Sequence, residues 1–365
     1  MHALYAGLMS GTSLDGVDAV LVEASPDGRL RAHHHQPLPV RLHDELLALN
    51  ARDGIDELAR AAAAARDLAD VYADSLAAVL AAAGVPATQV RAVGAHGQTV
   101  RHRPEQGYTI QLLDAARLAE RSGVDVVANL RSRDVAAGGQ GAPLVPAFHA
   151  ARFARPGEDT AVLNLGGIAN LTLLAADGGV LGFDTGPANA LLDHWAQQHL
   201  GQAYDAHGAW AAGGRVDPGL LASLRDEAFF RARPPKSTGR DLFEPGWLQA
   251  RLAAHPGITP QDVMATLLAL TVSTVADALL SQAPHTTRLR VCGGGARNDA
   301  LMAALARALP GMEVRDTHAD GVAPEHVEAW AFAWLAQAFV ERRPGNLPAV
   351  TGAIGPRILG ALYPA

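Results

Sequence analysis

The 365-residue chain has little of what several protein classes require. It has one cysteine, Cys292, so it can form neither an internal disulfide nor a cysteine-based zinc cluster. Its 30 basic residues are outnumbered by 37 acidic ones, which argues against a nucleic-acid-binding protein. No basic segment precedes an apolar core at the start, as in a secretory signal, and the longest uncharged apolar run, residues 263–276, is too short to span a bilayer. We therefore expect a cytoplasmic protein.

What the chain does have is glycine and apolar residues. It contains 37 glycines, about a tenth of its length and above the average of roughly 7%. Hydrophobic residues make up 49% and charged residues only 18%, so there is ample material for a packed core. This balance is typical of an enzyme with many tight turns, and the length predicts two domains.

Two segments resemble each other. Residues 4–22 and 161–174 each contain a β-type run, a small glycine-rich turn and a second β-type run, which predicts a hairpin. Their wide separation in sequence indicates a duplicated domain rather than a short repeat.

Strands and helices alternate along the rest of the chain, which predicts an α/β protein with mixed sheets. Strands are expected at 89–95, 124–130, 180–183 and 289–292, and helices at 56–83, 115–122, 188–200, 260–281, 296–309 and 324–341. Residues 349–365 are expected to return to the first domain, and the histidine run 33–35 to form a solvated loop.

The first glycine turn, Gly11-Thr12-Ser13, suits a phosphate because glycines let bare backbone N–H groups surround the anion. Asp15 and Asp18 follow it and could hold a magnesium ion directly or through water. The alternative is a purely structural hairpin turn, which the second turn at Gly166-Gly167 makes less favourable.

A third turn, Gly293-Gly294-Gly295, follows a predicted strand and opens a predicted helix, a position where nucleotides often bind. Asn298 breaks the dinucleotide-binding pattern, and the chain's one lysine, Lys236, does not lie in a P-loop. Any nucleotide would therefore bind without either common fingerprint.

Asp184 is the candidate catalytic carboxylate, because it ends an apolar strand and could act as a general base on water or a hydroxyl. The alternative is a turn or helix-capping aspartate. Glu328 lies on an otherwise apolar helix face and requires either a ligand or a buried arginine partner. His96, Gln98 and Thr99 offer donors and acceptors suited to a sugar, and Arg131 suits a carboxylate; the alternative for each is a loop residue whose polar groups are satisfied within the protein.

Together these segments resemble the anhydro-N-acetylmuramic acid kinase family over nearly the whole chain. The motifs that carry the resemblance are residues 7–18, 94–99, 140–146, 164–170, 182–187, 236–240 and 291–295. One departure is Ala188, which stands where the family pattern leads us to expect glycine.

The resemblance implies two actin-like (ribonuclease H-like) domains, each a mixed sheet flanked by helices, with an ATP cleft between them. The expected domains are residues 1–130 plus 349–365, and residues 131–348. The residues implied to bind ATP are Gly11, Thr12, Ser13, Leu14, Asp15, Gly16, Val17, Asp18, Gly166, Gly167, Asn170, Gly293, Gly294, Gly295 and Asn298. Asp184 would be the catalytic base, His96, Gln98, Thr99, Arg131 and Glu328 would bind the amino sugar, and Asp15 and Asp18 would hold Mg²⁺.

The implied reaction opens 1,6-anhydro-N-acetylmuramic acid with water and transfers the γ-phosphoryl group of ATP to O6, a step of peptidoglycan recycling. The resemblance also implies a homodimer without nucleic-acid or membrane partners. Two other functions fit the same fold class: an actin-like ATPase that couples ATP turnover to partner binding, and a kinase with another sugar acceptor.

Overall fold

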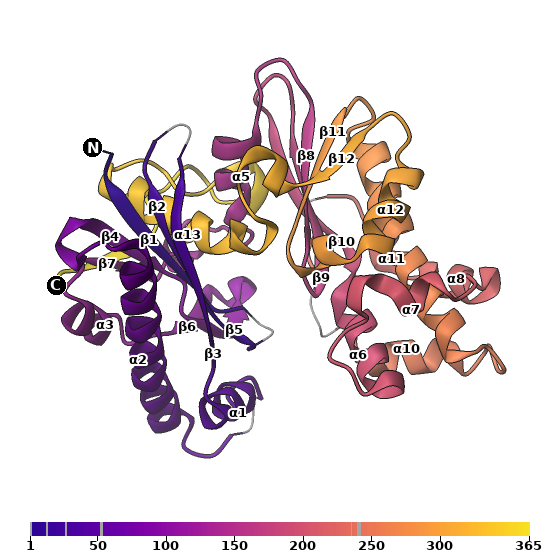
Figure 1. The fold of residues 1–365 in the computed structure, drawn as a ribbon, viewed down its shortest axis with the longest axis horizontal. Coiled ribbons are helices and arrows are strands. Elements are labelled where there is room, and N and C mark those ends of the chain that lie inside the picture. Colours follow the sequence, from indigo (N-terminus) through magenta and orange to yellow (C-terminus); the bar gives the residue numbers. More distant parts are fainter. Residues whose placement is uncertain (1, 12–13, 26–27, 52–53, 235, 239–241) are drawn as a thin grey trace. The chain divides into compact units, whose positions relative to one another are not determined.

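The structure, a computed structural model, describes residues 2–11, 14–25, 28–51, 54–234, 236–238 and 242–365. It divides into two compact units (Figure 1). Unit 1 contains residues 1–148 and 326–365, and unit 2 contains residues 149–325. The predicted domains differ from these units at 131–148 and 326–348, which pack with unit 1. As a statement about independent domains, the predicted division stays a prediction.

Unit 1 is built on a six-stranded mixed sheet of order β13-β7-β4-β1-β2-β3. Its strands are β1 (Leu4–Met9), β2 (Gly16–Glu23), β3 (Leu30–Pro37), β4 (Val90–Ala95), β7 (Val126–Ala128) and β13 (Ala361–Tyr363), and a separate hairpin pairs β5 (Gln98–Arg103) with β6 (Tyr108–Leu112). Its helices are α1 (Val40–Ala48), α2 (Glu57–Ala83), α3 (Ala115–Ser122), α4 (Ser132–Ala136), α13 (Val327–Val340) and α14 (Pro348–Thr351), with α5 (Val145–Phe153) crossing the unit boundary.

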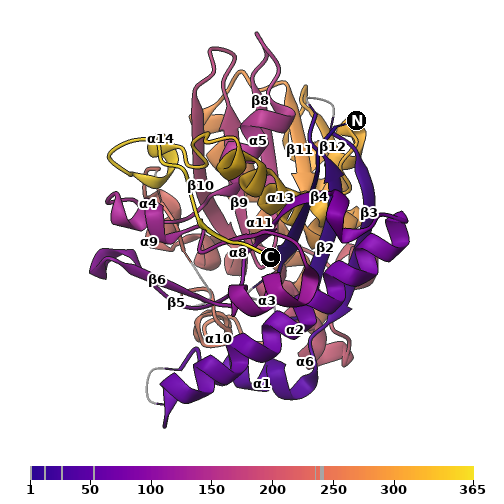
Figure 2. The same ribbon diagram turned by 90° about the vertical axis from the view of Figure 1, so that its left-hand side faces the viewer.

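The two faces of this sheet are covered by different helices (Figure 2). Ala6 and Leu8 of β1 share a core with Leu68 and Tyr72 of α2. Gly7, between them, points toward α13, where an added Cβ would lie 1.9 Å from the carbonyl oxygen of Ala329. The helix backbone therefore rests directly on the strand, and only glycine fits at this position.

Unit 2 is built on a five-stranded sheet of order β10-β9-β8-β11-β12. Its strands are β8 (Thr160–Leu165), β9 (Ile168–Leu174), β10 (Val180–Pro187), β11 (Arg288–Cys292) and β12 (Glu313–Asp316). Its helices are α6 (Asn189–Leu200), α7 (Ala209–Ala212), α8 (Pro218–Arg225), α9 (Ala228–Arg231), α10 (Pro245–Leu252), α11 (Pro260–Gln282) and α12 (Asp299–Ala308).

The two sheets have the same topology. In each sheet three strands are antiparallel to their neighbours, β3-β2-β1 in unit 1 and β10-β9-β8 in unit 2. Two further strands lie beyond β1 and β8, namely β4-β7 and β11-β12, and run parallel to them. The duplication predicted from the two hairpins is confirmed, and so is the α/β class with mixed sheets flanked by helices. In the tail, β13 pairs antiparallel with β7 of the first sheet.

Helix α11 forms the core of unit 2. Thr259 caps its N-terminus by accepting a hydrogen bond from the backbone N–H of Asp262, and Pro260 occupies the first turn. Within the described residues, α11 is the one helix long and apolar enough to cross a membrane. Because 72% of its most apolar window is buried inside the protein, these side chains serve as core.

Several predicted elements differ from the structure in type or in extent. Residues 33–35 belong to strand β3 rather than to a loop, and their exposure alternates along the strand. Strand β10 continues through Asp184 to Pro187 instead of ending at 183. The helix predicted from 296 begins only at Asp299, because Gly294–Arg297 form a 3-10 turn and Asn298 caps the helix through the N–H of Leu301.

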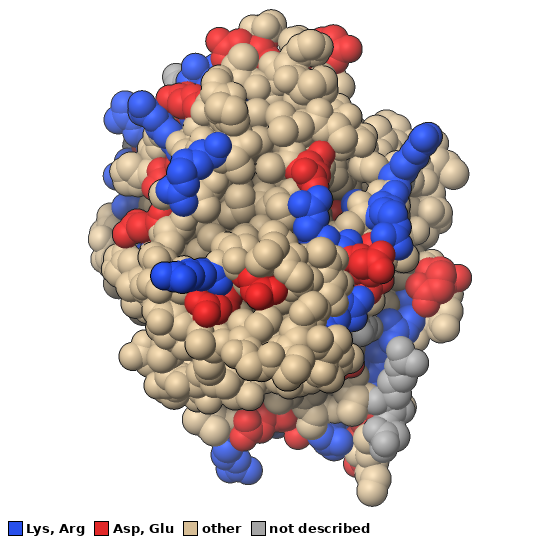
Figure 3. All heavy atoms as spheres, turned by 90° about the vertical axis from the view of Figure 1, so that its right-hand side faces the viewer, with Lys and Arg blue, Asp and Glu red and all other residues tan. Residues whose placement is uncertain are grey.

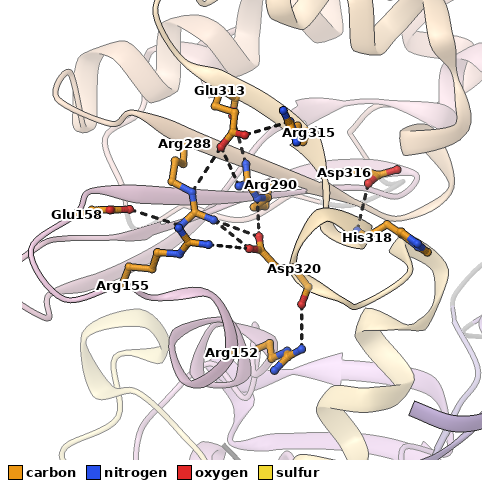
Figure 4. Close-up of polar contacts among 10 residues, drawn as sticks. All are labelled: Arg152, Arg155, Glu158, Arg288, Arg290, Glu313, Arg315, Asp316, His318 and Asp320. Carbon is orange, nitrogen blue, oxygen red and sulfur yellow. Dashed lines mark hydrogen bonds and ion pairs between the residues drawn. The ribbon is translucent and has the colours of Figure 1, made fainter. Parts of the chain in front are cut away.

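A cluster of ion pairs fixes the start of β11 in unit 2 (Figure 4). The buried side chains of Arg288 and Arg290 both contact the carboxylate of Asp320, at 3.1 and 2.5 Å. Asp320 also accepts from Arg155, and its backbone carbonyl accepts from Arg152. The cluster thus joins the first and last segments of unit 2.

On the face drawn in Figure 3, basic and acidic side chains are interspersed rather than gathered by sign.

Candidate functional site

Unit 2 places two glycine turns at one sheet edge. Strands β8 and β11 are parallel neighbours, so Gly166-Gly167 after β8 and Gly293–Gly295 after β11 leave the sheet at the same end. Gly293 has φ +79°, and an added Cβ would lie 2.3 Å from Oδ1 of Asn164. At Gly166 and Gly294 the nearest atom would be 3.6 and 3.8 Å away, so bare backbone borders open space there. Such an edge suits the close approach of a phosphate.

The start of helix α6 holds the first of these turns. The backbone N–H of Asn189 donates to the carbonyl of Gly166, and those of Ala188 and Ala190 donate to Gly167. These amides therefore fix the turn. Ala188, which replaces an expected glycine, is buried, and the turn keeps its hydrogen bonds.

Asp184 lies on β10 beside this turn. It pairs with Asn170 of β9, and the register then shifts by one residue before Gly186, so that Thr185 is the bulged residue. Burial raises the pKa of Asp184 to about 6, although the N–H of Thr238 and the charge of Lys236 oppose the shift. A carboxylate with this pKa is poised to accept a proton near neutral pH.

A segment that sequence reasoning left unassigned holds Asp184 in place. The backbone N–H of Thr238 donates to Oδ2 of Asp184 at 2.8 Å, and the N–H of Asp184 donates to the carbonyl of Lys236. Lys236 is itself anchored, since its ammonium donates to the carbonyl of Phe229 and lies over the ring. The contacts are to backbone atoms, which is why side-chain chemistry gave no signal.

Unit 1 carries the other glycine turn, between β1 and β2. Thr12 and Ser13 lie outside the described residues. The side chains of Leu14 and Val17 are buried in the core, so these two residues can offer a ligand only their backbone. Gly16 packs against the backbone of β3. The N–H of Leu14 donates to the carbonyl of Gly11.

Asp15 and Asp18 follow this turn at the start of β2. Asp15 is exposed, and Oδ1 of Asp18 lies 2.8 Å from Nδ1 of His35. Among the described residues, no group of three or more His, Cys, Asp or Glu side chains is arranged to hold a metal. Two carboxylates match the way Mg²⁺ is held in kinases, by one or two protein ligands with phosphates and water.

Gln98, at the start of β5, links the turn to the predicted sugar residues. Its Nε2 donates to the carbonyl of Gly11 at 3.1 Å. Its Oε1 is buried and has no hydrogen-bond partner among the described residues. A buried acceptor without a donor is costly, so this atom points to a ligand hydroxyl or water. Thr99, next in the strand, accepts from Gln111 of β6.

His96 and Arg131 form a fixed pair. Burial, together with the nearby Arg131 charge, lowers the pKa of His96 to about 3, so the ring is neutral. Its Nδ1 donates to the carbonyl of Ser10, and its Nε2 accepts from Arg131. Both ring nitrogens are therefore occupied by protein groups. The third nitrogen of the Arg131 guanidinium, Nη1, donates to the carbonyl of Gly141 at 2.9 Å.

Helix α13 brings Glu328 to the same place. The ring of Phe332, one turn later, packs against that of His96 in a tilted arrangement, with ring centroids 4.8 Å apart. Burial lowers the pKa of Arg131 to about 10, and the Glu328 and Asp134 carboxylates oppose this shift, so Arg131 stays cationic. Arg131 is thus a cation whose charge interacts with the Glu328 carboxylate, and the choice between a ligand and an arginine partner for Glu328 stays a prediction.

The structure thus assembles the predicted residues into two groups. Unit 1 joins Gly11, Gln98, His96, Arg131 and Glu328 through shared contacts, while unit 2 places Asp184 and Asn170 near its glycine turns. Asn298 caps α12 with its side chain. Sequence reasoning missed Ser10, which contacts His96, and Asp134, which contacts Gly141, because the partner of Ser10 and two further partners of Asp134 are far away in sequence.

Two related sheets of the same strand order, each with a glycine turn at the end of its first strand, define the actin-like (ribonuclease H-like) fold class, which hosts more than one activity. The family model for anhydro-N-acetylmuramic acid kinase matches residues 3–365. Curated relatives of that name include those of Bordetella petrii, 60% identical over 99% of this chain and 96% of the relative, and Variovorax paradoxus, 56% identical over 99% of both. A solved dehydratase activator from Clostridium difficile is 13% identical with a TM-score of 0.49, covering 94% of this chain and 96% of that one.

The chain belongs to the anhydro-N-acetylmuramic acid kinase family. It is therefore a phosphotransferase, and the resemblance found in its motifs is confirmed over its whole length.

Proposed function

We propose that the protein hydrolyses the internal ether of 1,6-anhydro-N-acetylmuramic acid and phosphorylates the released O6 with ATP, giving N-acetylmuramic acid 6-phosphate and ADP. Asp184 takes a proton from water, whose oxygen bonds to the anomeric carbon. The bond from that carbon to O6 breaks, and O6 accepts the γ-phosphoryl group. Phosphoryl transfer replaces the general acid of ordinary glycoside cleavage, so one carboxylate suffices.

The observation that carries the proposal is the state of Asp184. It is a largely buried carboxylate whose pKa is raised to about 6, held by Thr238 and placed beside a glycine turn. Perturbed carboxylates cluster at catalytic sites, because a general base works best when its pKa lies near the working pH. A merely structural turn aspartate is usually exposed or paired with a cation.

The other residues receive roles from their chemistry. The glycine turns of unit 2, with Asn170, and the turn from Gly11 to Asp18 would bind ATP. Gln98, Thr99, Arg131 and Glu328 would bind the sugar, with Arg131 for its carboxylate. We assign His96 to positioning, because both of its ring nitrogens already have protein partners.

Asp15 and Asp18 would hold a Mg²⁺ ion, which supplies charge neutralisation at the phosphates when bound. Carboxylate oxygens are the ligands that this ion prefers; Asp15 is exposed and Asp18 is half-buried beside His35. We also propose that the enzyme acts in the cytoplasm in peptidoglycan recycling, and as a homodimer, as the resemblance implies.

The test is a turnover experiment in ¹⁸O-labelled water with Mg-ATP and the anhydro sugar, followed by mass spectrometry. We expect a phosphorylated sugar with one ¹⁸O at the anomeric carbon from the wild type, and none from Asp184→Asn. Asp177→Asn, in the exposed turn after β9, is the matched control and should behave as wild type. ATP consumption without any sugar phosphate would contradict the proposal and favour a partner-coupled ATPase.

A further inference from the structure

Asp134 is a buried carboxylate that the proposed reaction does not use. It lies in helix α4 of unit 1 with no exposed surface. Its Oδ1 accepts from Nδ2 of Asn346 at 2.6 Å and from the hydroxyl of Thr351 at 2.7 Å, and its Oδ2 accepts from the backbone N–H of Gly141 at 2.8 Å. Burying a carboxylate costs free energy, and three short hydrogen bonds hold this one rigidly.

The turn from Gly138 to Gly141 packs closely around this carboxylate. The N–H of Gly139 donates to the carbonyl of Asp134, and an added Cβ at Gly139 would lie 2.2 Å from its Oδ2. Gly141 has φ +68°, which a side chain would strain. The N–H of Gln140 donates to the carbonyl of Thr351, so the same turn is tied to α14 as well.

Gly141 connects this arrangement to the sugar residues. Its N–H is held by Asp134, and its carbonyl accepts from Nη1 of Arg131. On its other side Arg131 donates to His96, which donates to the carbonyl of Ser10, the residue before the Gly11 turn. One hydrogen-bonded path thus runs from Asp134 through Arg131 to the predicted phosphate turn. Asp134 also acts on Arg131 directly through its negative charge.

We infer that Asp134 is a positioning residue, which sets the orientation of the Arg131 guanidinium for the carboxylate of the sugar through the backbone of Gly141. This inference rests on the proposed function of Arg131. Bidentate recognition of a carboxylate depends on the plane of the guanidinium, and small displacements of a binding group cost large factors in affinity. Asp134 therefore governs sugar binding without contacting the sugar.

The test measures the dissociation constants of the anhydro sugar and, separately, of ATP by titration calorimetry on the full chain. Asp134→Asn keeps the volume but cannot accept all three hydrogen bonds, so we expect about tenfold weaker sugar binding, with ATP binding within about twofold of wild type. Asp70→Asn is the control for loss of a carboxylate charge in unit 1: Asp70 is ion-paired to Arg117 and Arg121 and does not contact the path. It should leave both constants within about twofold.

A double-mutant cycle separates positioning from a general loss of structure. In an Arg131→Ala background, Asp134→Asn should cost no further sugar affinity, because it acts through the missing side chain. Thr351→Val, which removes one donor to Asp134, should weaken sugar binding about threefold and serves if Asp134→Asn does not fold.

Wild-type sugar affinity in Asp134→Asn, or the same loss with and without Arg131, would overturn the inference while leaving the proposed function intact. Failure of the wild type itself to bind the sugar would instead overturn the proposed function, and this inference with it.

Discussion

At the scale of single residues, burial decides the chemistry of the site. Asp184 and His96 are both desolvated, and in each case burial favours the neutral form, which raises the pKa of the acid to about 6 and lowers that of the base to about 3. The two groups are thereby given different tasks. Asp184 changes protonation state close to neutral pH, whereas His96 stays neutral and can only orient its neighbours.

This difference predicts the pH profile. Asp184 must be ionised to accept a proton, so kcat/KM should fall as pH drops through about 6, approaching tenfold per unit below it. His96 should add no second limb, because its pKa lies well below this range. The measurement is kcat/KM for the sugar from pH 5 to 8.5. A limb near pH 4, the ordinary range of an aspartate, would contradict the assignment of Asp184 as a buried base.

Residue types offered Asp184, Gln98 and Arg131 only as candidates beside a structural alternative, because a carboxylate, an amide or a guanidinium at the end of a strand has a recognisable chemistry, and the family resemblance then gave them roles. They did not predict Asp134, whose partners Asn346 and Thr351 are 212 and 217 residues away in sequence. They also missed the Thr238 contact to Asp184, which uses a backbone N–H that any residue other than proline has. Contacts of these two kinds become visible only once the chain is folded.

At the scale of elements, the long helices were the most predictable. Helix α2 runs from Glu57 to Ala83 and ends at Gly84, which has φ +65°, as its alanine-rich sequence and terminal glycine indicated. Strand β3 was missed because its histidines read as polar loop residues. In the structure His35 pairs with Asp18 and the ring of His33 packs on that of His326. Pairing with β2 at the edge of the sheet, rather than an alternating apolar sequence, therefore keeps this strand in place.

The contact between β4 and α13 predicts a severe effect for one methyl group. A Cβ at Gly94 would lie 1.9 Å from the carbonyl oxygen of Phe332, so Gly94→Ala must displace the helix that carries Glu328. We expect a loss of about 3 kcal/mol or more in the free energy of unfolding, with weaker sugar binding in the folded fraction. Chemical denaturation and calorimetry measure both.

The control for this prediction is Gly84→Ala, because Gly84 has φ +65° but open space around it. It should cost only about 1 kcal/mol, from backbone strain. An equal loss in the two variants would show that the close approach of strand and helix is not what constrains Gly94.

The ion-pair cluster of Figure 4 predicts a pH-dependent contribution to stability. Burial raises the pKa of Asp320, but the hydrogen bond from Arg290 and the charges of Arg290, Arg288 and Arg155 lower it overall. A lowered carboxyl pKa stabilises the fold at neutral pH, and this contribution is lost as the pH falls through the folded-state value.

Asp320→Asn should therefore lose about 2–4 kcal/mol at pH 7, because two buried arginines lose their shared counter-charge, and less in acid. Denaturant titrations at pH 7 and pH 4 test this. Asp226→Asn, which breaks an exposed pair with Arg231, should cost under about 0.5 kcal/mol. A similar small loss for Asp320→Asn would mean that the cluster is no more than a solvated surface network.

At the scale of the whole molecule, duplication was the most informative feature of the sequence. Two glycine-turn hairpins predicted two related sheets, and the shared strand order bears this out. The limits of the compact units were harder to predict from the sequence, because helix α13 follows unit 2 in the chain yet packs on β1 and β4 of unit 1. Nothing in its apolar sequence indicates which sheet it covers.

The late position of α13 has a consequence for synthesis on the ribosome. Unit 2 is one continuous stretch and can complete its core once residue 325 has emerged, whereas unit 1 must wait for the last forty residues. Until then the face of its sheet that contains Gly7 and Gly94 has no helix to cover it. The first half of the protein to be made is therefore the last to be finished, and a nascent chain stalled before α13 exposes a ready target for chaperones and proteases.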